Sequence, residues 1–238
     1  MSRMAPHRTP VETVERIVGF ALVVFVFTAC SKDSTSPTAR VATAFNVVSG
    51  SAQSGTVNNT LAAPVVIEVT DQSGSPLAGA VVTFSPASGS VATTQVTTDA
   101  SGLAQTAWTI GTMAGADSMS VSVASLSAVT VVATGTPDQP ATITIISGNA
   151  QVGTAGASLS SALSVKVTDQ FGNPVPNVPV QWSDNAGGSL AATTTTTDAS
   201  GIAQDTYALG PSAGTDDVVA TITVGSGSMA AMFAEQAN

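Results

Sequence analysis

Residues 65–76 read VVIEVTDQSGSP, and residues 163–174 repeat the pattern as LSVKVTDQFGNP. In both copies the apolar positions before the aspartate alternate with other residues, which is the period of a β-strand with one buried face. On the opposite face Glu68 is replaced by Lys166, a reversal of charge that water tolerates and a core does not. The Asp-x-x-Gly-x-Pro that follows is typical of a tight turn, because Asp accepts backbone N–H bonds and Gly supplies positive φ. The stretch therefore predicts a half-buried strand that ends in a turn, twice.

A second block repeats farther along the chain. Residues 98–105 read TDASGLAQ, and residues 197–204 read TDASGIAQ. Their spacing is one residue longer than that of the first block, and we expect the extra residue within the threonine run 193–197. The two blocks together predict two tandem domains, at 44–136 and 141–238, and the short segment 137–140 between them contains two prolines and is expected to be a semi-rigid linker. The predicted turn residues are Asp71, Gly74, Asp99 and Gly102 in the first copy and Asp169, Gly172, Asp198 and Gly201 in the second.

The same alternation predicts the aromatic residues of each core. Phe84 and Trp182 fall on the inward face of one strand, and Trp108 and Tyr207 on the inward face of another. Tryptophans can also stack on sugars, but apolar neighbours on the same face favour the core for both. Asp205 shares the inward face with Tyr207, and we expect it near the open end of its strand. About seven short strands per unit, at this spacing, predict an all-β chain with two immunoglobulin-like β-sandwiches.

The repeated VTDxxGxP and TDxxGxA blocks, with an inward aromatic on the third strand, resemble the bacterial immunoglobulin-like domains of the intimin and invasin type. The resemblance covers nearly all of residues 44–238 and implies tandem sandwich modules that act as rods. The sequence shows neither the outer-membrane barrel nor the receptor-binding tip of those adhesins, so the resemblance does not extend to receptor binding. It also lacks the paired cysteines of antibody domains.

The beginning of the chain has the layout of a bacterial lipoprotein signal peptide. Arginines precede the apolar segment 17–29, which as a helix would rise about 20 Å, short of the ~30 Å hydrocarbon core. Residues 27–30, FTAC, resemble the lipobox, in which small residues precede a cysteine that becomes the acylated N-terminus. We therefore predict a signal peptide at 1–29 and lipidation, such as by palmitate, at Cys30, the one cysteine of the chain. The alternatives are an ordinary secretory signal or an uncleaved signal anchor.

After the cysteine, residues 30–43 are polar and rich in Ser and Thr, which predicts a flexible tether. Ser31 lacks the acidic character that marks inner-membrane retention in enteric bacteria. By that resemblance we expect a cell-envelope protein that is lipid-anchored to the outer membrane.

Composition argues against several classes of function. Only Lys32, Arg40 and Lys166 are basic after Cys30, so the acidic chain lacks the cationic surface that nucleic-acid binding needs. The single histidine, His7, lies in the leader, which removes most nucleophilic and zinc chemistry. The adjacent acids at 216–217 would point to opposite faces of a strand. We therefore expect no enzyme activity, no catalytic residue, no metal and no cofactor.

Two alternatives for polar residues remain open. Aspartates could supply oxygen ligands for calcium, although each repeated aspartate already suits its turn. The threonine run 193–197 could be glycosylated or could form an edge strand, and its β-branched residues favour the strand. The candidate calcium ligands are Asp71, Asp99, Asp138, Asp169 and Asp198.

The sequence thus predicts a non-enzymatic, membrane-anchored surface protein whose repeats serve as a spacer or an adhesion module. A surface protein or a glycan is the expected partner, reached through loops or an edge strand. The alternatives are a purely structural envelope scaffold and an accessory carbohydrate-binding module.

Overall fold

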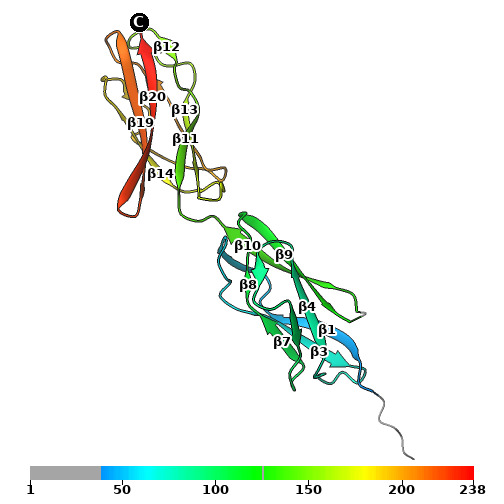
Figure 1. Cartoon of the computed structure of the whole chain (residues 1–238). Helices are drawn as coiled ribbons and strands as arrows, with labels where there is room; N and C mark the ends of the chain where they lie inside the picture. The colour runs from blue at the N-terminus through cyan, green and yellow to red at the C-terminus, as the bar shows by residue number, and fades with distance from the viewer. Residues whose placement is uncertain (1–38, 125) are drawn as a thin grey trace, which may run out of the picture. The chain divides into compact units, whose positions relative to one another are not determined.

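The computed structural model describes residues 39–124 and 126–238, and every regular element in them is a β-strand (Figure 1). The predicted signal peptide, Cys30 and most of the predicted tether lie outside the described residues. Within the described ranges no helix is long and apolar enough to cross a membrane. The all-β, immunoglobulin-like fold is confirmed for both repeats.

The first repeat is a sandwich of a three-stranded and a five-stranded sheet. The three-stranded sheet has the order β1-β3-β7, and the five-stranded sheet has the order β2-β10-β9-β4-β6. β10 pairs antiparallel with β9 and parallel with the short strand β2. The outermost pair at this edge of the five-stranded sheet is therefore parallel. A small ribbon of β5 and β8 completes the repeat. The strands are β1 (Ala42–Ser49), β2 (Gln53–Thr56), β3 (Val65–Asp71), β4 (Val81–Pro86), β5 (Ser90–Val91), β6 (Gln95–Thr97), β7 (Leu103–Thr106), β8 (Trp108–Thr109), β9 (Gly115–Val123) and β10 (Val129–Thr136).

The second repeat has the same topology. Its sheets have the orders β11-β13-β17 and β12-β20-β19-β14-β16, with a ribbon of β15 and β18. β20 again pairs antiparallel with β19 and parallel with a short strand, β12 (Figure 1). The strands are β11 (Thr142–Ser147), β12 (Val152–Gly153), β13 (Leu163–Thr168), β14 (Pro179–Asp184), β15 (Ser189–Leu190), β16 (Thr194–Thr196), β17 (Ile202–Asp205), β18 (Tyr207–Ala208), β19 (Gly214–Val224) and β20 (Gly227–Ala237).

Each sandwich encloses its own apolar core. The inward residues of β3, Val65, Ile67 and Val69, are completely buried, and the outward residues between them are half-buried. This alternation lets one face of the strand meet the opposite sheet while the other meets water. In the second core the rings of Trp182 and Phe233 lie 6.0 Å apart at a tilt of 40°. Packing of this kind must hold each sandwich, since the chain has one cysteine and no internal disulfide.

The extra residue of the second repeat lies earlier than the sequence suggested. β4 and β14 begin at residues 81 and 179, whereas β5 and β15 begin at residues 90 and 189, so the spacing has already grown by one before the threonine run. The insertion therefore lies in the loop 185–188, and the expectation that it falls within 193–197 was wrong. An extra residue in a paired strand would disturb its register, whereas a loop absorbs it without cost to the ladder. The threonine run itself supplies the edge strand β16, paired with β14.

The two repeats also differ in the hairpin in the middle of the five-stranded sheet, β9–β10 in the first repeat and β19–β20 in the second. β9 and β10 have 9 and 8 residues, whereas β19 and β20 have 11 residues each. The longer hairpin stays paired as far as Val224 and Gly227. Val224 and Met229 from this extension pack against the second core.

Candidate functional site

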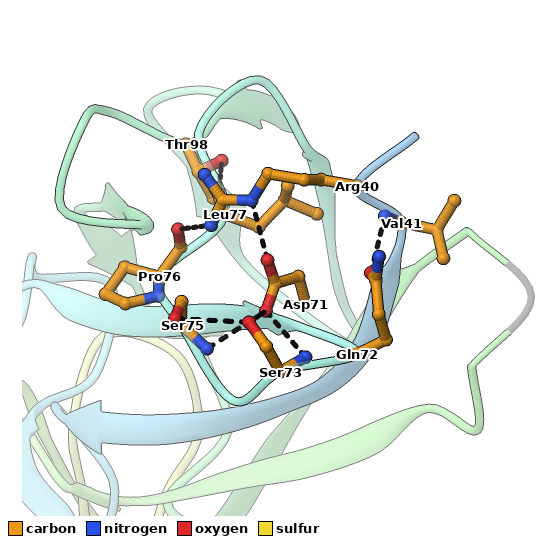
Figure 2. Close-up of polar contacts among 9 residues, drawn as sticks. All are labelled: Arg40, Val41, Asp71, Gln72, Ser73, Ser75, Pro76, Leu77 and Thr98. Atoms are coloured by element: carbon orange, nitrogen blue, oxygen red, sulfur yellow. Dashed lines mark hydrogen bonds and ion pairs between the residues drawn. The ribbon is translucent and has the colours of Figure 1, made fainter. Parts of the chain in front are cut away.

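A cluster of polar contacts in the first repeat lies at the turn that follows β3 (Figure 2). Asp71 is 4% exposed, and its Oδ1 accepts hydrogen bonds from the Ser73 N–H at 2.9 Å, the Ser73 hydroxyl at 2.7 Å and the Ser75 N–H at 3.0 Å. The Gly74 N–H donates to the Asp71 carbonyl, and Gly74 has a φ of 75°. One carboxylate thus fixes the whole turn, which is the chemistry that the Asp-x-x-Gly spacing requires.

Arg40 connects this turn to the segment that enters the domain. Its Nε donates to Asp71 Oδ2 at 2.6 Å, and its Nη2 donates to the Pro76 carbonyl at 2.5 Å. Next to it, the Val41 N–H donates to Gln72 Oε1 at 3.1 Å. Figure 2 shows the guanidinium lying over the turn with Asp71 beneath it. Hydrogen bonds from Ser73 and Arg40 hold the pKa of the Asp71 carboxyl far below its usual value of 3.8.

Asp169 organises the corresponding turn of the second repeat. Its Oδ1 accepts from the N–H groups of Phe171 and Asn173, both at 2.9 Å. Its Oδ2 accepts from the Asn173 side-chain amide at 2.9 Å and from the Asp138 N–H at 3.0 Å, so the entering chain is again held by the turn carboxylate. Burial raises the pKa of Asp169, but the hydrogen bonds from Asn173, Asp138 and Phe171 outweigh it, and the pKa is lowered.

Asn173 has a further role that its counterpart in the first repeat, Ser75, lacks. Its Nδ2 donates to the Thr112 carbonyl at 2.8 Å, and its Oδ1 accepts from the Ala114 N–H at 2.8 Å. Thr112 and Ala114 lie in the loop between β8 and β9 of the first repeat. One side-chain amide therefore satisfies two backbone groups of the preceding domain. Ser75 is too short for such a bridge, and its hydroxyl accepts from Ser73.

The second pair of predicted turns has a plainer structure. Asp99 Oδ1 accepts from the Ser101 and Leu103 N–H groups, and Asp198 repeats the arrangement with Ser200 and Ile202. These bonds order the turns that lead into β7 and β17. Each turn glycine has positive φ.

The aromatic residues named from the sequence lie in the two cores. Phe84, Trp108, Trp182 and Tyr207 are between 0% and 3% exposed, so none presents a ring to a sugar. Trp182 Nε1 donates to Thr195 Oγ1 at 2.8 Å. The Tyr207 hydroxyl lies 3.3 Å from both Asp184 Oδ1 and Asp216 Oδ2, and burial together with these two carboxylates raises the pKa of Tyr207.

Among the buried acids of the second repeat, Asp205 was placed on an inward face from the sequence, whereas Asp216 and Glu235 were not recognised as buried. Asp205 ends β17, as expected, but it is 6% exposed and accepts from the Ala192 N–H, so that end of the strand is not open. Asp216 and Glu235 are each 1% exposed. The alternation Ala231, Phe233, Glu235, Ala237 is the signal that would have placed Glu235 inside. Across the described parts of the chain, no three acidic, histidine or cysteine side chains are grouped closely enough to hold a metal ion.

Two shallow grooves border β1 in the first repeat. One of about 520 Å³ lies beside the chain entry, where Arg40 and Val41 face Leu77, Val81 and Val123. Another, of about 300 Å³, lies farther along β1, between Phe45 and the loop that holds Leu126. β1 is an edge strand, and Val48 on it is 52% exposed. The first repeat therefore offers an edge with apolar side chains.

Comparisons with known proteins agree with this architecture. Residues 142–233 match the family of bacterial Ig-like domains (group 1). InvD from Yersinia pseudotuberculosis has a TM-score of 0.56 with this chain at 20% identity, over 77% of this chain and 54% of InvD. The Escherichia coli adhesin FdeC has a TM-score of 0.49 at 18% identity, over 83% and 66% of the two chains. The Y. pseudotuberculosis adhesin InvE has a TM-score of 0.40 at 21% identity, over 80% of this chain and 58% of InvE.

At 20% identity, InvD shares with this chain the fold alone. The predicted resemblance to Ig-like repeats of the intimin and invasin type is confirmed. The chain spans about 58% of the length of InvE. A comparison with curated protein sequences found no match.

Proposed function

We propose that this chain is a non-enzymatic, lipid-anchored protein of the bacterial cell envelope, in which two tandem Ig-like domains act as a spacer or adhesion module. Its parts are a signal peptide at 1–29, a tether at 30–43, domains at 44–136 and 141–238, and a linker at 137–140. Lipidation of Cys30 would attach the tether to the outer membrane. The similarity of its Ig-like domains to those of bacterial adhesins supports a role at the cell surface. The acidity of the mature chain argues against nucleic acid as a partner.

The observation that carries the spacer role is that each domain binds the segment entering it through one buried aspartate. Arg40 meets Asp71, and the Asp138 backbone meets Asp169. The entering segment is therefore tied by hydrogen bonds to the turn after β3 or β13. In the second repeat, Asn173 adds two hydrogen bonds to the preceding domain. This is the local construction that a spacer needs.

The anchor is tested by Cys30→Ser in cells that express the full chain. Without the thiol no diacylglycerol can be added, and two acyl chains are what make membrane attachment stable. We expect the wild-type chain in the membrane fraction and in the detergent phase after Triton X-114 partition, and the variant in the aqueous phase. Ser31→Ala, a neighbouring change that keeps the thiol, should partition like the wild type.

A Cys30→Ser variant that remains in the detergent phase would instead identify an uncleaved signal anchor. In that case the spacer proposal would stand, but the lipid anchor would not.

The adhesion role is tested by the edge strand β1. Added strands pair with exposed edges, and a lysine on an edge strand opposes such pairing. We expect Val48→Lys to abolish capture of a surface-protein partner by cells that display the full chain. Val132→Lys is the matched control, because Val132 is 47% exposed but lies on β10, which is paired on both sides.

Equal loss in both variants would point to the sheet face rather than to the edge. If displayed wild-type chain captures neither a protein nor any glycan on an array, the structural scaffold becomes the better description.

A further inference from the structure

Glu235 is a buried acid that only the second repeat contains. It lies on the inner face of β20 between Phe233 and Ala237, and it is opposite Asp216 on β19. The residue in the same register of the first repeat is Ala133, which faces Asp117 on β9. A carboxyl group thus replaces a methyl group at one position of an otherwise shared core. The replacement lies where β20 meets the short edge strand β12.

The contacts of Glu235 place it at the start of β12. Its Oε2 accepts a hydrogen bond from the Gln151 N–H at 2.6 Å, while its Oε1 has no hydrogen-bond partner among the described residues. The Ala150 N–H also donates to this carboxyl, whereas its counterpart in the first repeat, the Ala52 N–H, donates to the Val132 carbonyl at 2.8 Å. In the second repeat, hydrogen bonds to a side-chain carboxyl therefore replace a main-chain hydrogen bond at the start of the edge strand.

The edge strand is otherwise held by main-chain bonds. β12 pairs with β20 at Val152 and Gly153. Around that pair, the Gln236 N–H donates to the Gln151 carbonyl and the Asn238 N–H to the Gly153 carbonyl, both at 2.9 Å, and the Ala155 N–H donates to the Asn238 carbonyl at 3.0 Å. β12 is the outermost strand of its sheet, and local opening is easiest at an exposed edge.

The surroundings of Glu235 are acidic. Asp216 is itself 1% exposed and accepts from the Gly210 N–H at 2.6 Å and from the Tyr207 hydroxyl on β18, which also contacts Asp184 at the end of β14. The residues just before β12 contribute only the backbone N–H groups of Ala150 and Gln151. Lys166, the one basic residue of the second repeat, is half-buried on β13, where its register partners are in β11 and β17. No described positive charge therefore compensates an ionised Glu235.

We propose that Glu235 is a pH-sensitive latch, which keeps β12 fastened to β20 when its carboxyl is protonated and favours opening of that edge when the carboxyl is ionised. Opening brings the ionised carboxylate to water and relieves its burial beside Asp216. It also leaves the main-chain groups of Gln236 and Ala237 without β12, so β20 becomes an edge that an extended segment can join. The latch does not depend on the proposed membrane anchor or partner.

The direction of the pH dependence follows from burial. Burial raises the pKa of the Glu235 carboxyl above its usual value of 4.5, and the hydrogen bonds from Gln151 and Ala150 only partly offset this. The closed form therefore binds a proton that the open form releases, and closure weakens as pH rises from 4.5 through the raised pKa. Asp71 and Asp169 act in the opposite direction. Their pKa values are lowered, so the stability they contribute is present above 3.8 and is lost as pH falls below it.

Amide hydrogen exchange of the full chain in detergent tests the latch. Between pH 4.5 and 8, after correction for intrinsic exchange, opening of residues 150–154 should increase by up to about tenfold per pH unit until the raised pKa is passed. Residues 53–56 in the first repeat serve as the internal reference. Because the chain's single histidine lies in the leader, no described histidine titrates in this window.

Two variants remove the ionisable group. Glu235→Gln keeps the shape and the acceptor, and Glu235→Ala restores the residue type of the first repeat. Both should leave β12 protected at every pH in the window. Asp217→Asn is the matched control, because Asp217 is next to Asp216 on the outward side of β19, and it should retain the wild-type pH dependence.

The latch is refuted if exchange at 150–154 in the wild type does not change with pH. It is also refuted if the two Glu235 variants show the same pH dependence of exchange as the wild type. If one variant fails to fold, the other carries the comparison by itself.

Discussion

Replacing Trp108 by Ala is expected to lower the free energy of unfolding of the first repeat by about 3–5 kcal/mol. Trp108 is completely buried in the cluster that contains Ile67 and Phe84. Removal of its indole takes away apolar contact and leaves a cavity that two hydrogen-bonded sheets cannot collapse to fill. Urea unfolding followed by circular dichroism, with Trp182 fluorescence as a separate reporter of the second repeat, measures the effect. A loss below about 1 kcal/mol would show that the first core is not organised around Trp108.

A matched pair of milder substitutions separates the effect on stability of lost side-chain volume from the effect of a lost hydrogen bond. Trp108 Nε1 is buried and has no hydrogen-bond partner in the described structure, whereas Trp182 Nε1 donates to Thr195. Trp108→Phe therefore loses volume alone and relieves an unsatisfied donor. Trp182→Phe loses a hydrogen bond as well, a difference of about 1 kcal/mol. Trp182→Phe should be the more destabilising of the two, and the reverse order would contradict these contacts.

Gly102→Ala is expected to lower the free energy of unfolding of the first repeat by roughly 3–5 kcal/mol, from left-handed strain and steric overlap together. Gly102 has a φ of +72°, and a Cβ there would lie 2.7 Å from the Val69 carbonyl oxygen and 3.0 Å from the Leu77 nitrogen. Those two atoms form the hydrogen bond that joins the end of β3 to its turn, at 2.8 Å. A methyl group must therefore displace main chain, which cannot rotate away as a side chain can.

Gly74→Ala is the control for this prediction. Gly74 has nearly the same φ, +75°, but a Cβ there would meet nothing within 4 Å. Only the cost of a left-handed alanine remains, about 1–2 kcal/mol. Thermal and urea unfolding of the two variants should differ by the steric contribution alone. Equal losses would mean that the turn moves freely away from β3.

The strands and the repeat could be predicted because they depend on local pattern. Val65, Ile67 and Val69 alternate in the sequence and are buried as a set, so their side of the sheet needed no tertiary information. Family likeness at 142–233 and the all-β architecture agree with that prediction. The position of the inserted residue could not be read in the same way. A run of identical threonines offers no register, and only strand pairing shows that the extra residue lies in the loop 185–188.

The turn aspartates show which of their contacts can be predicted from neighbouring residues in the sequence and which cannot. The spacing from Asp71 to Gly74 predicts which backbone groups the carboxylate meets, because those groups are its neighbours in the chain. It does not predict Arg40, which comes from 31 residues earlier and meets Asp71 only after β1 has paired with β3. Asn173 is a similar case, because its partners at 112 and 114 lie in another domain.

By itself, the sequence determined what short-range periodicity and turn chemistry can determine: two copies of a strand-rich unit, their inward faces and the residues of their turns. Only the tertiary structure decided which edge strand each sheet has, which groups the turn carboxylates bind, and that Glu235 is buried beside Asp216 with one carboxylate oxygen lacking a partner among the described residues. The physical reason is that these features depend on the pairing of segments far apart in the chain. The free-energy cost of burying a carboxyl group at an inward position depends on the hydrogen-bond partners and charges that folding places around it.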